Sequence, residues 1–182
     1  QDIVYASDGT MYFVGNWNGN NCNAYPTNIP GMENSTSFDS SDLVLSKRSA
    51  NGTVLWIHAI QNPSTLEAVD LALDANDKPI LLFQAAGSQY TEFDRSNNHN
   101  IPANSATQTA MILVQFDSDG QVIWKEFTKR LGGYTAATTS ENSETSLVVS
   151  PDGNITFSGI MRSYTINAAA SFRIGSGNNQ IN

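Results

Sequence analysis

The sequence is poor in several residue types that common functions require. It contains one cysteine, Cys22, which excludes an intramolecular disulfide and a zinc site built from cysteines. Charged residues make up 14% of the 182 residues, and the 9 Lys and Arg are outnumbered by 17 Asp and Glu. These basic residues form no cluster, whereas nucleic-acid binding needs a basic surface that neutralises phosphates. We therefore expect no nucleic-acid partner.

Long apolar runs and helical periodicity are also missing. No run approaches the ~18 apolar residues of a membrane span, so we expect no membrane insertion. The polarity comes mainly from Asn, Ser, Thr, Gly and Gln, which suits short strands joined by hydrogen-bonding loops, outside the cytoplasm. A chain that begins with Gln1 at the edge of an apolar strand resembles a cleaved, mature product, although a trimmed chain would look the same. The composition favours a secreted protein, extracellular or at the cell surface.

An internal repeat is the most informative feature that the sequence has. Residues 43–56 reappear as residues 111–124, and the glycine and tryptophan of each copy keep the same 68-residue offset. A second element, in which an apolar run, a turn and another apolar run follow one another, occurs three times, at residues 3–14, 71–82 and 147–158. Such units cannot bury their apolar faces alone and must stack on copies of themselves.

Short segments rich in β-branched and aromatic residues predict strands throughout the chain. The predicted strands cover residues 11–14, 43–47, 53–60, 69–73, 80–83, 111–116, 121–127, 146–149 and 155–157. Asp or Asn precedes Gly at residues 8–9, 51–52, 119–120 and 152–153, and this pair favours tight hairpin turns because it accepts positive φ. Residues 76–79 are a degraded copy of such a turn. The fold class is therefore all-β.

Four antiparallel strands in every 68 to 76 residues are typical of a β-propeller blade. We expect one β-repeat domain over residues 1–182, with repeats at about 1–70, 71–146 and an incomplete 147–182. Long Asn-rich loops join equivalent strands at residues 16–39, 88–108 and 162–182. Since propellers need roughly four to eight blades to close, the propeller is partial or open. Either the chain is a fragment, which the repeat count favours, or several chains complete the structure.

Several segments resemble the bacterial secreted seven-bladed beta-propeller repeat family, known as SBBP-like. The segments are DGTMYFVG (8–15), DGNITFSG (152–159), DLVLSK (42–47), NGTVLW (51–56) and QYTEFD (89–94). The resemblance covers about two and a half repeats, and it implies a blade architecture in a secreted or surface protein. The sequence departs from the pattern where Phe83 replaces Gly and where Ala110 replaces the Asp at position 42.

No pattern of catalytic, cofactor-binding or metal-ligating residues is recognisable. His58 lies in an apolar strand and is interpreted as a packed or edge histidine, and His99 has no second histidine at ligand spacing. Residues 117–120 (DSDG) superficially resemble a calcium loop, but the equivalent SANG lacks the carboxylates, so both are interpreted as turns. Trp56 and Trp124 recur at equivalent positions and are expected to be structural wedges between blades.

Trp17 is the exception among the tryptophans, because it lies in a polar loop. Asn16, Asn18 and Tyr25 are close to it in the sequence, and aromatic rings beside amides suit sugar recognition through stacking and hydrogen bonds. These four residues are the candidate glycan contacts. The alternative is an insertion loop that closes onto its own blade.

The expected function is a non-catalytic structural or binding module of the cell surface, such as part of an adhesin, an appendage or an assembly. The alternatives are a fragment of a propeller enzyme, either a quinoprotein-like dehydrogenase or a glycan-active enzyme, and a carbohydrate-binding propeller. No cofactor is expected, and the expected partners are other protein chains or further blades of the same polypeptide, with glycans as a further option. An uncovered apolar face is expected near residues 155–157 and 172–174.

Overall fold

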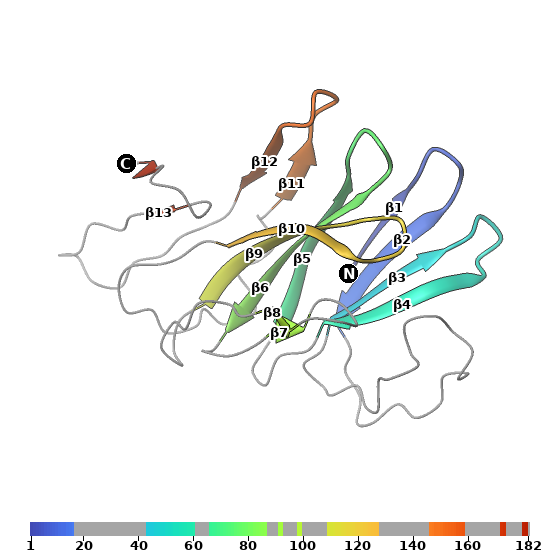
Figure 1. Cartoon of the computed structure of the whole chain (residues 1–182), viewed down its shortest axis with the longest axis horizontal. Helices are drawn as coiled ribbons and strands as arrows, with labels where there is room; N and C mark the ends of the chain where they lie inside the picture. Colours follow the sequence, from blue (N-terminus) through green and yellow to red (C-terminus); the bar gives the residue numbers. More distant parts are fainter. Residues whose placement is uncertain are drawn as a thin grey trace.

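The protein consists of a series of antiparallel β-sheets joined along the chain (Figure 1). The structure is a computed structural model, and it describes residues 1–16, 43–60, 66–86, 91–92, 98–99, 109–127, 146–158, 172–173 and 180–181. The strands are β1 (Asp2–Tyr5), β2 (Met11–Asn16), β3 (Leu43–Arg48), β4 (Val54–Ile60), β5 (Leu66–Leu73), β6 (Pro79–Ala86), β7 (Thr91–Glu92), β8 (Asn98–His99), β9 (Thr109–Phe116), β10 (Val122–Phe127), β11 (Ser146–Val149), β12 (Ile155–Ser158), β13 (Phe172–Arg173) and β14 (Gln180–Ile181).

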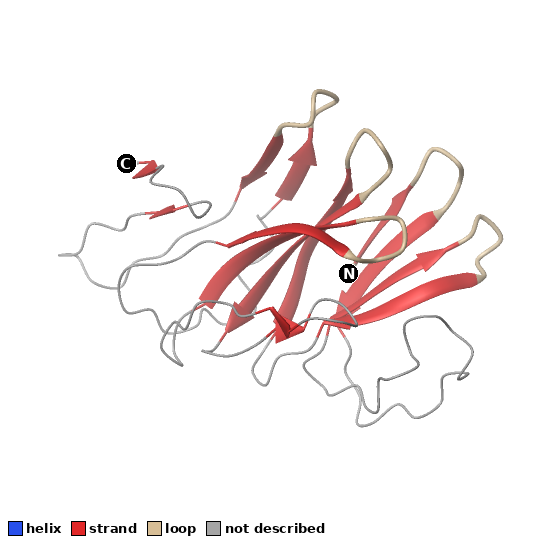
Figure 2. Ribbon diagram, in the orientation of Figure 1, coloured by secondary structure: helices blue, strands red, loops and turns tan. Residues whose placement is uncertain are grey.

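Two of the sheets have four strands each and the same meander topology. The first sheet has the order β1-β2-β3-β4, and the second has the order β5-β6-β9-β10 when read from its first strand. β11 pairs with β12 in a third sheet, and β7–β8 and β13–β14 form separate two-stranded ladders. Figure 2 shows that every element drawn in the described part of the chain is a strand or a loop. The all-β prediction is confirmed, and each four-stranded sheet has the form of a propeller-like blade.

Five hairpin turns have the same hydrogen-bond pattern, which explains the repeated turn sequences. In the first, Ala6 N–H donates to Thr10 O at 2.8 Å and Gly9 N–H donates to Ala6 O at 3.0 Å. The turns at residues 49–53, 74–78, 117–121 and 150–154 repeat both bonds. The third loop residue has positive φ in each, between 80° and 87° at four glycines and 59° at Asp77. A three-residue loop that ends in this conformation is a common hairpin connection, so the predicted turns are confirmed, including the copy without glycine.

The sheets stack through their first strands. β1 contacts β5, and β5 contacts β11, so the first strand of each copy lies beside the first strand of the next. Figure 1 shows the three hairpins β1–β2, β5–β6 and β11–β12 side by side, with their turns at the same end. This arrangement places equivalent residues of successive copies against one another, as an open series of blades requires.

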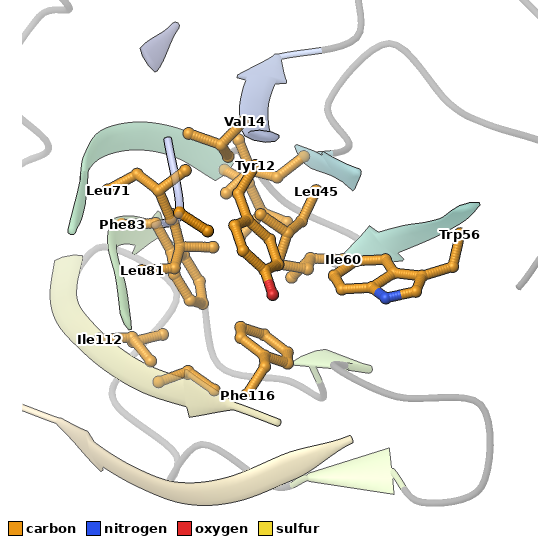
Figure 3. Packing of buried hydrophobic residues seen from close by; sticks show 14 residues of the cluster. Tyr12, Val14, Leu45, Trp56, Ile60, Leu71, Leu81, Phe83, Ile112 and Phe116 are labelled. Atoms are coloured by element: carbon orange, nitrogen blue, oxygen red, sulfur yellow. The ribbon is translucent and has the colours of Figure 1, made fainter. Parts of the chain in front are cut away.

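Apolar side chains fill the two junctions between the stacked sheets. At the first junction, Tyr12, Val14 and Leu45 of the first sheet pack against Phe83 and Phe116 of the second. Figure 3 shows these side chains pointing toward one another, with the Tyr12 ring among them. The second junction is formed by buried side chains of the second and third sheets, namely Ile80, Leu82, Leu113 and Leu147. Alternation along β6 and β9 lets the second sheet contribute to both junctions.

The structure corrects some details of the sequence-based expectations. Ile155 and Phe157, which were expected on an uncovered face, are half-buried and pack against the second junction. β5 begins at Leu66, three residues before the start of the strand predicted at residues 69–73. The short ladder β7–β8 lies in a segment that was expected to be a loop. The side chains of residues 172–174 lie outside the described part of the structure.

Candidate functional site

The polar side chains with the most definite geometry lie at the junctions between sheets. Asp2, at the start of β1, accepts a hydrogen bond from Leu71 N–H of β5 through Oδ2 at 3.0 Å. Asp70, 68 residues later, accepts one from Leu147 N–H of β11 through Oδ2 at 2.5 Å. The same carboxylate position thus joins the first sheet to the second and the second sheet to the third. A charged acceptor makes these bonds stronger than neutral ones.

The two carboxyl groups of Asp2 and Asp70 lie close together. Leu71 N–H donates to both Asp2 Oδ2 and Asp70 Oδ1, at 3.0 Å and 2.9 Å. The pKa of Asp70 is raised above its ordinary value, chiefly because burial penalises its charged form, and the neighbouring Asp2 carboxyl adds to this effect. Two neighbouring carboxyl groups could serve in catalysis. Here their oxygens accept hydrogen bonds from the backbone of the stacked strands.

A second contact lies between the outer hairpins of the first two sheets. Trp56 Nε1 donates to the carbonyl oxygen of Ser118 at 2.9 Å, and Lys47 Nζ donates to the same oxygen at 3.0 Å. Ser118 lies in the β9–β10 turn, so two side chains of the first sheet bind the backbone of the second. The prediction that Trp56 is a wedge between blades is confirmed.

His58 lies beneath this contact and is buried. Its ring centroid is 4.9 Å from that of Trp56 and 6.5 Å from that of Phe116, which belongs to the second sheet. A Cβ on Gly120 would come within 2.2 Å of His58 Nε2, so the backbone of the β9–β10 turn packs directly on the ring. The interpretation of His58 as a packed histidine is confirmed.

Trp124 and Gln115 occupy the positions of Trp56 and Lys47 in the second copy, but their bonds differ. Trp124 Nε1 donates to Gln115 Oε1 at 2.5 Å, and Gln115 Nε2 donates to Asp74 Oδ2 at 2.7 Å. All of these bonds lie within the second sheet or its turn. Trp124 also packs against the apolar side chains of the second junction, as expected of a wedge.

The turns of the first two copies are also connected. The Ser7 hydroxyl and backbone N–H both donate to Asp77 Oδ2. Asp77 is the residue with positive φ that stands in place of a glycine, so its side chain supplies a contact that glycine could not. The DSDG segment likewise acts as a turn, because Asp117 Oδ1 accepts hydrogen bonds from the backbone N–H groups of Asp119 and Gln121.

Of the four candidate glycan contacts, only Asn16 belongs to the described residues. Its Nδ2 donates to Leu66 O at 2.7 Å, and its Oδ1 accepts from Ala68 N–H at 3.1 Å, so its amide joins β2 to β5. Trp17, Asn18 and Tyr25 lie outside the described part of the structure, and their role in sugar binding stays a prediction. The side chain of His99 is likewise not described.

Within the described ranges, no three His, Cys, Asp or Glu residues come together in a group that could bind a metal ion. No helix with the length and apolar character of a membrane span occurs in the part of the chain that the structure describes.

Comparisons with protein-family models, with curated proteins and with solved structures found no match.

Sequence reasoning missed two sets of functional contacts. It did not assign a role to Asp2 and Asp70, although each directly precedes an apolar residue of a first strand and the two keep the 68-residue offset. It also did not predict the bonds between the Asn16 amide and β5, and the assignment of Asn16 to sugar binding stays a prediction. A polar residue that recurs at the same place in a repeat was the signal for the first set.

Proposed function

We propose that this chain is a non-catalytic structural or binding module of the bacterial cell surface or extracellular space, built from stacked blades of the SBBP-like type. The observation that carries the proposal is the use of its polar side chains. The residues that could have formed a reactive or ligand site, such as Asp2, Asp70 and His58, instead bond to or pack on the next sheet. A module whose polar groups join repeats is suited to building an extended or closed scaffold.

Composition supports the extracellular part of the proposal. Few charged residues, a single cysteine and abundant Asn, Ser and Thr suit a surface protein that presents long polar loops. The net charge of −8 keeps such a protein soluble and disfavours binding to polyanions. Adhesins, surface appendages and their assemblies are the classes of protein that fit these properties.

Surface display on intact cells of the source organism tests the proposal directly. We expect an antibody against the chain to label unpermeabilised cells, or to detect the protein in the culture medium, and we expect added protease to remove the surface label. A cytoplasmic marker protein that resists the same protease is the control for cell integrity. Labelling that requires permeabilisation would contradict the proposed location.

The enzymatic alternative and the glycan-binding alternative have separate tests. Binding of the purified chain to a glycan array, lost on Trp17→Ala, would assign a glycan ligand to the module and would support its binding role. A purified protein that turns over a sugar or reduces a quinone-type electron acceptor would overturn the non-catalytic assignment. We expect neither turnover reaction.

A further inference from the structure

The first strands of the three copies share a position that faces the preceding copy. It is occupied by Ile3 in β1, Leu71 in β5 and Leu147 in β11. Leu71 and Leu147 are 3% and 6% exposed because each packs into a junction, but Ile3 is 45% exposed. The position is therefore buried wherever a preceding copy lies alongside.

The residue two positions later in each strand faces the same way, and it too is buried only where a preceding copy lies alongside. Leu73 and Val149 pack against the first and second junctions, respectively. The equivalent residue in β1 is Tyr5, which is 66% exposed. Ile3 and Tyr5 together form an exposed apolar surface at one end of the stack, which we name the β1 end face.

The opposite end of the stack has a matching pattern. Val4 and Ala72 face the following copy and pack against the first and second junctions. Val148 occupies the same position in β11 and is 60% exposed. Val148, together with the exposed neighbouring Thr156 on β12, forms what we name the β11 end face.

The two observed junctions show what kind of surface covers each end face. In both, the side of a sheet equivalent to the β11 end face packs on the side equivalent to the β1 end face. We propose that the β1 end face of this chain binds the β11 end face of a second copy, so that the copies associate head to tail. This inference rests on the proposed function as a stacking module and adds the identity of a partner.

The β1 end face has the backbone donor of the polar contact seen at the known junctions. Ile3 N–H donates to Asp2 Oδ1 at 2.8 Å, just as Leu71 N–H donates to Asp70 Oδ1 at 2.9 Å. The amide of Ile3 thus has the local geometry of the amide that binds a carboxylate of the preceding copy. In a second copy, the residue at that carboxylate position is Ser146.

This substitution of serine for aspartate has a measurable consequence. A serine hydroxyl is shorter than a carboxylate and carries no charge, so it is a weaker acceptor for Ile3 N–H. The junction between copies is therefore weaker than the two junctions within the chain. Ser146→Asn supplies a side-chain oxygen with the reach of the aspartates in the first two copies without adding a charge beside Asp2, and we expect it to tighten association by up to roughly tenfold, as one hydrogen bond would.

A head-to-tail contact uses two different surfaces of each copy. Such a heterologous contact leaves one of each surface available at the ends of a pair, so further copies can add until the series closes into a ring or extends as a filament. The average mass in solution should therefore rise with concentration, and it can rise beyond the mass of a dimer.

Sedimentation velocity and light scattering on the 182-residue chain over a range of concentrations test the proposal. We expect reversible self-association that Ile3→Asp weakens by at least roughly tenfold, because it places a charge in an apolar contact. Ile123→Asp is the matched control, since Ile123 has the same residue type and the same exposed fraction of 45% but lies on β10, away from both end faces. Tyr5→Ser is the second variant if Ile3→Asp does not fold, as judged by circular dichroism.

The variants distinguish a head-to-tail contact from other kinds of association. Association that Ile3→Asp weakens, Ser146→Asn tightens and Ile123→Asp leaves unchanged supports the head-to-tail contact. A folded chain that stays monomeric at every concentration overturns it and points to further blades of the same polypeptide as the cover. Association that responds equally to Ile3→Asp and Ile123→Asp also overturns it. Neither result affects the surface-display test, so failure of this inference and failure of the proposed function are distinguishable.

Discussion

The two junctions between sheets use equivalent residues in different ways. At the first junction, Lys47 and Trp56 donate to the carbonyl of Ser118 in the next sheet. In the second copy, Gln115 and Trp124 hold the same positions, but they bond to each other within one sheet. Both Trp56 and Trp124 pack as apolar wedges. Trp56 also donates a hydrogen bond across the junction, whereas Trp124 donates within its own sheet.

The common features of the two junctions are an apolar core and a carboxylate that accepts from a backbone N–H of the next first strand. The comparison shows that the apolar core and the carboxylate contact persist where the tryptophan hydrogen bond changes, and that the core involves many more side chains than the single carboxylate. We therefore expect core substitutions to have the largest effect on stability, followed by changes in close packing, then in the indole hydrogen bond, and finally in the carboxylates.

The first prediction concerns the apolar core of the first junction. Phe83 is fully buried between the two four-stranded sheets, so Phe83→Ala should lower the free energy of unfolding by about 3–5 kcal/mol through lost burial and a new cavity. Leu82→Ala, one residue away on the opposite side of β6, makes the same test at the second junction, with an expected loss of about 2–5 kcal/mol. Urea denaturation measures both, and a loss below about 1 kcal/mol for Phe83→Ala would show that the first junction is not formed in solution.

The second prediction compares two glycines at equivalent turn positions. Gly52 and Gly120 have φ values of 87° and 80°, so alanine at either position is strained by about 1–2 kcal/mol. A Cβ at Gly52 meets nothing within 4 Å, whereas at Gly120 it would lie 2.2 Å from His58 Nε2 and 3.3 Å from Trp56. We expect Gly120→Ala to lower the free energy of unfolding by about 2–4 kcal/mol, since overpacking adds to the strain. Equal losses for the two variants would contradict the close contact of this turn with the first sheet.

The third prediction separates the two tryptophans. Trp56→Phe removes the donor to Ser118 O and should lower the free energy of unfolding by about 1–3 kcal/mol, through the lost bond and the smaller ring. Trp124→Phe, which removes a donor to the Gln115 side chain, should have a smaller effect because Trp124 is only half-buried whereas Trp56 is 5% exposed, so the smaller ring loses less packing. Thermal unfolding followed by circular dichroism measures the order, and a larger loss for Trp124→Phe would reverse the comparison between the junctions.

Much of this fold could be predicted from sequence because its signals are local. The Asp-Gly and Asn-Gly turns and the alternation of apolar residues determine the hairpins, and the predicted β3–β4 hairpin is confirmed with Leu43 opposite Ile60. Asp77 adopts the positive φ that glycine has at the equivalent position of the other four turns, so the turn forms without a glycine.

The contacts between sheets were harder to predict, because they join residues about 70 positions apart. Nothing in the local sequence of Asp2 shows that its carboxylate accepts from Leu71 N–H. Phe83, which departs from the glycine of the repeat pattern, fills the interior of the first junction, where Gly15 occupies the equivalent position in the first sheet. The apolar residues left exposed at the ends of the stack depend on which sheets have neighbours, and local sequence does not determine this.

The last prediction concerns the carboxylates and has the smallest expected effect. The pKa of Asp70 is raised, so the folded state binds this proton more tightly than the unfolded state does. The stability contributed by this linkage is present below the ordinary Asp pKa of 3.8 and is lost as the pH rises through the higher folded value. Asp70→Asn removes this loss and keeps an oxygen acceptor for Leu147 N–H. At neutral pH the variant should therefore be as stable as the wild type, or more stable by about 1 kcal/mol or less. The gain is small because solvent screens a half-buried group.

Asp152→Asn is the matched control with the opposite sign. The Ser150 hydroxyl, which donates to Asp152, is the main cause of the lowered pKa of that carboxyl. Its contribution to stability is therefore present above pH 3.8 and is lost as the pH falls through the lower folded value. Free energies of unfolding measured for both variants from acidic to neutral pH should differ from the wild type in opposite directions. A strong destabilisation of Asp70→Asn at neutral pH would show that the charge of Asp70, and not only its oxygen acceptor, is required to join the second sheet to β11.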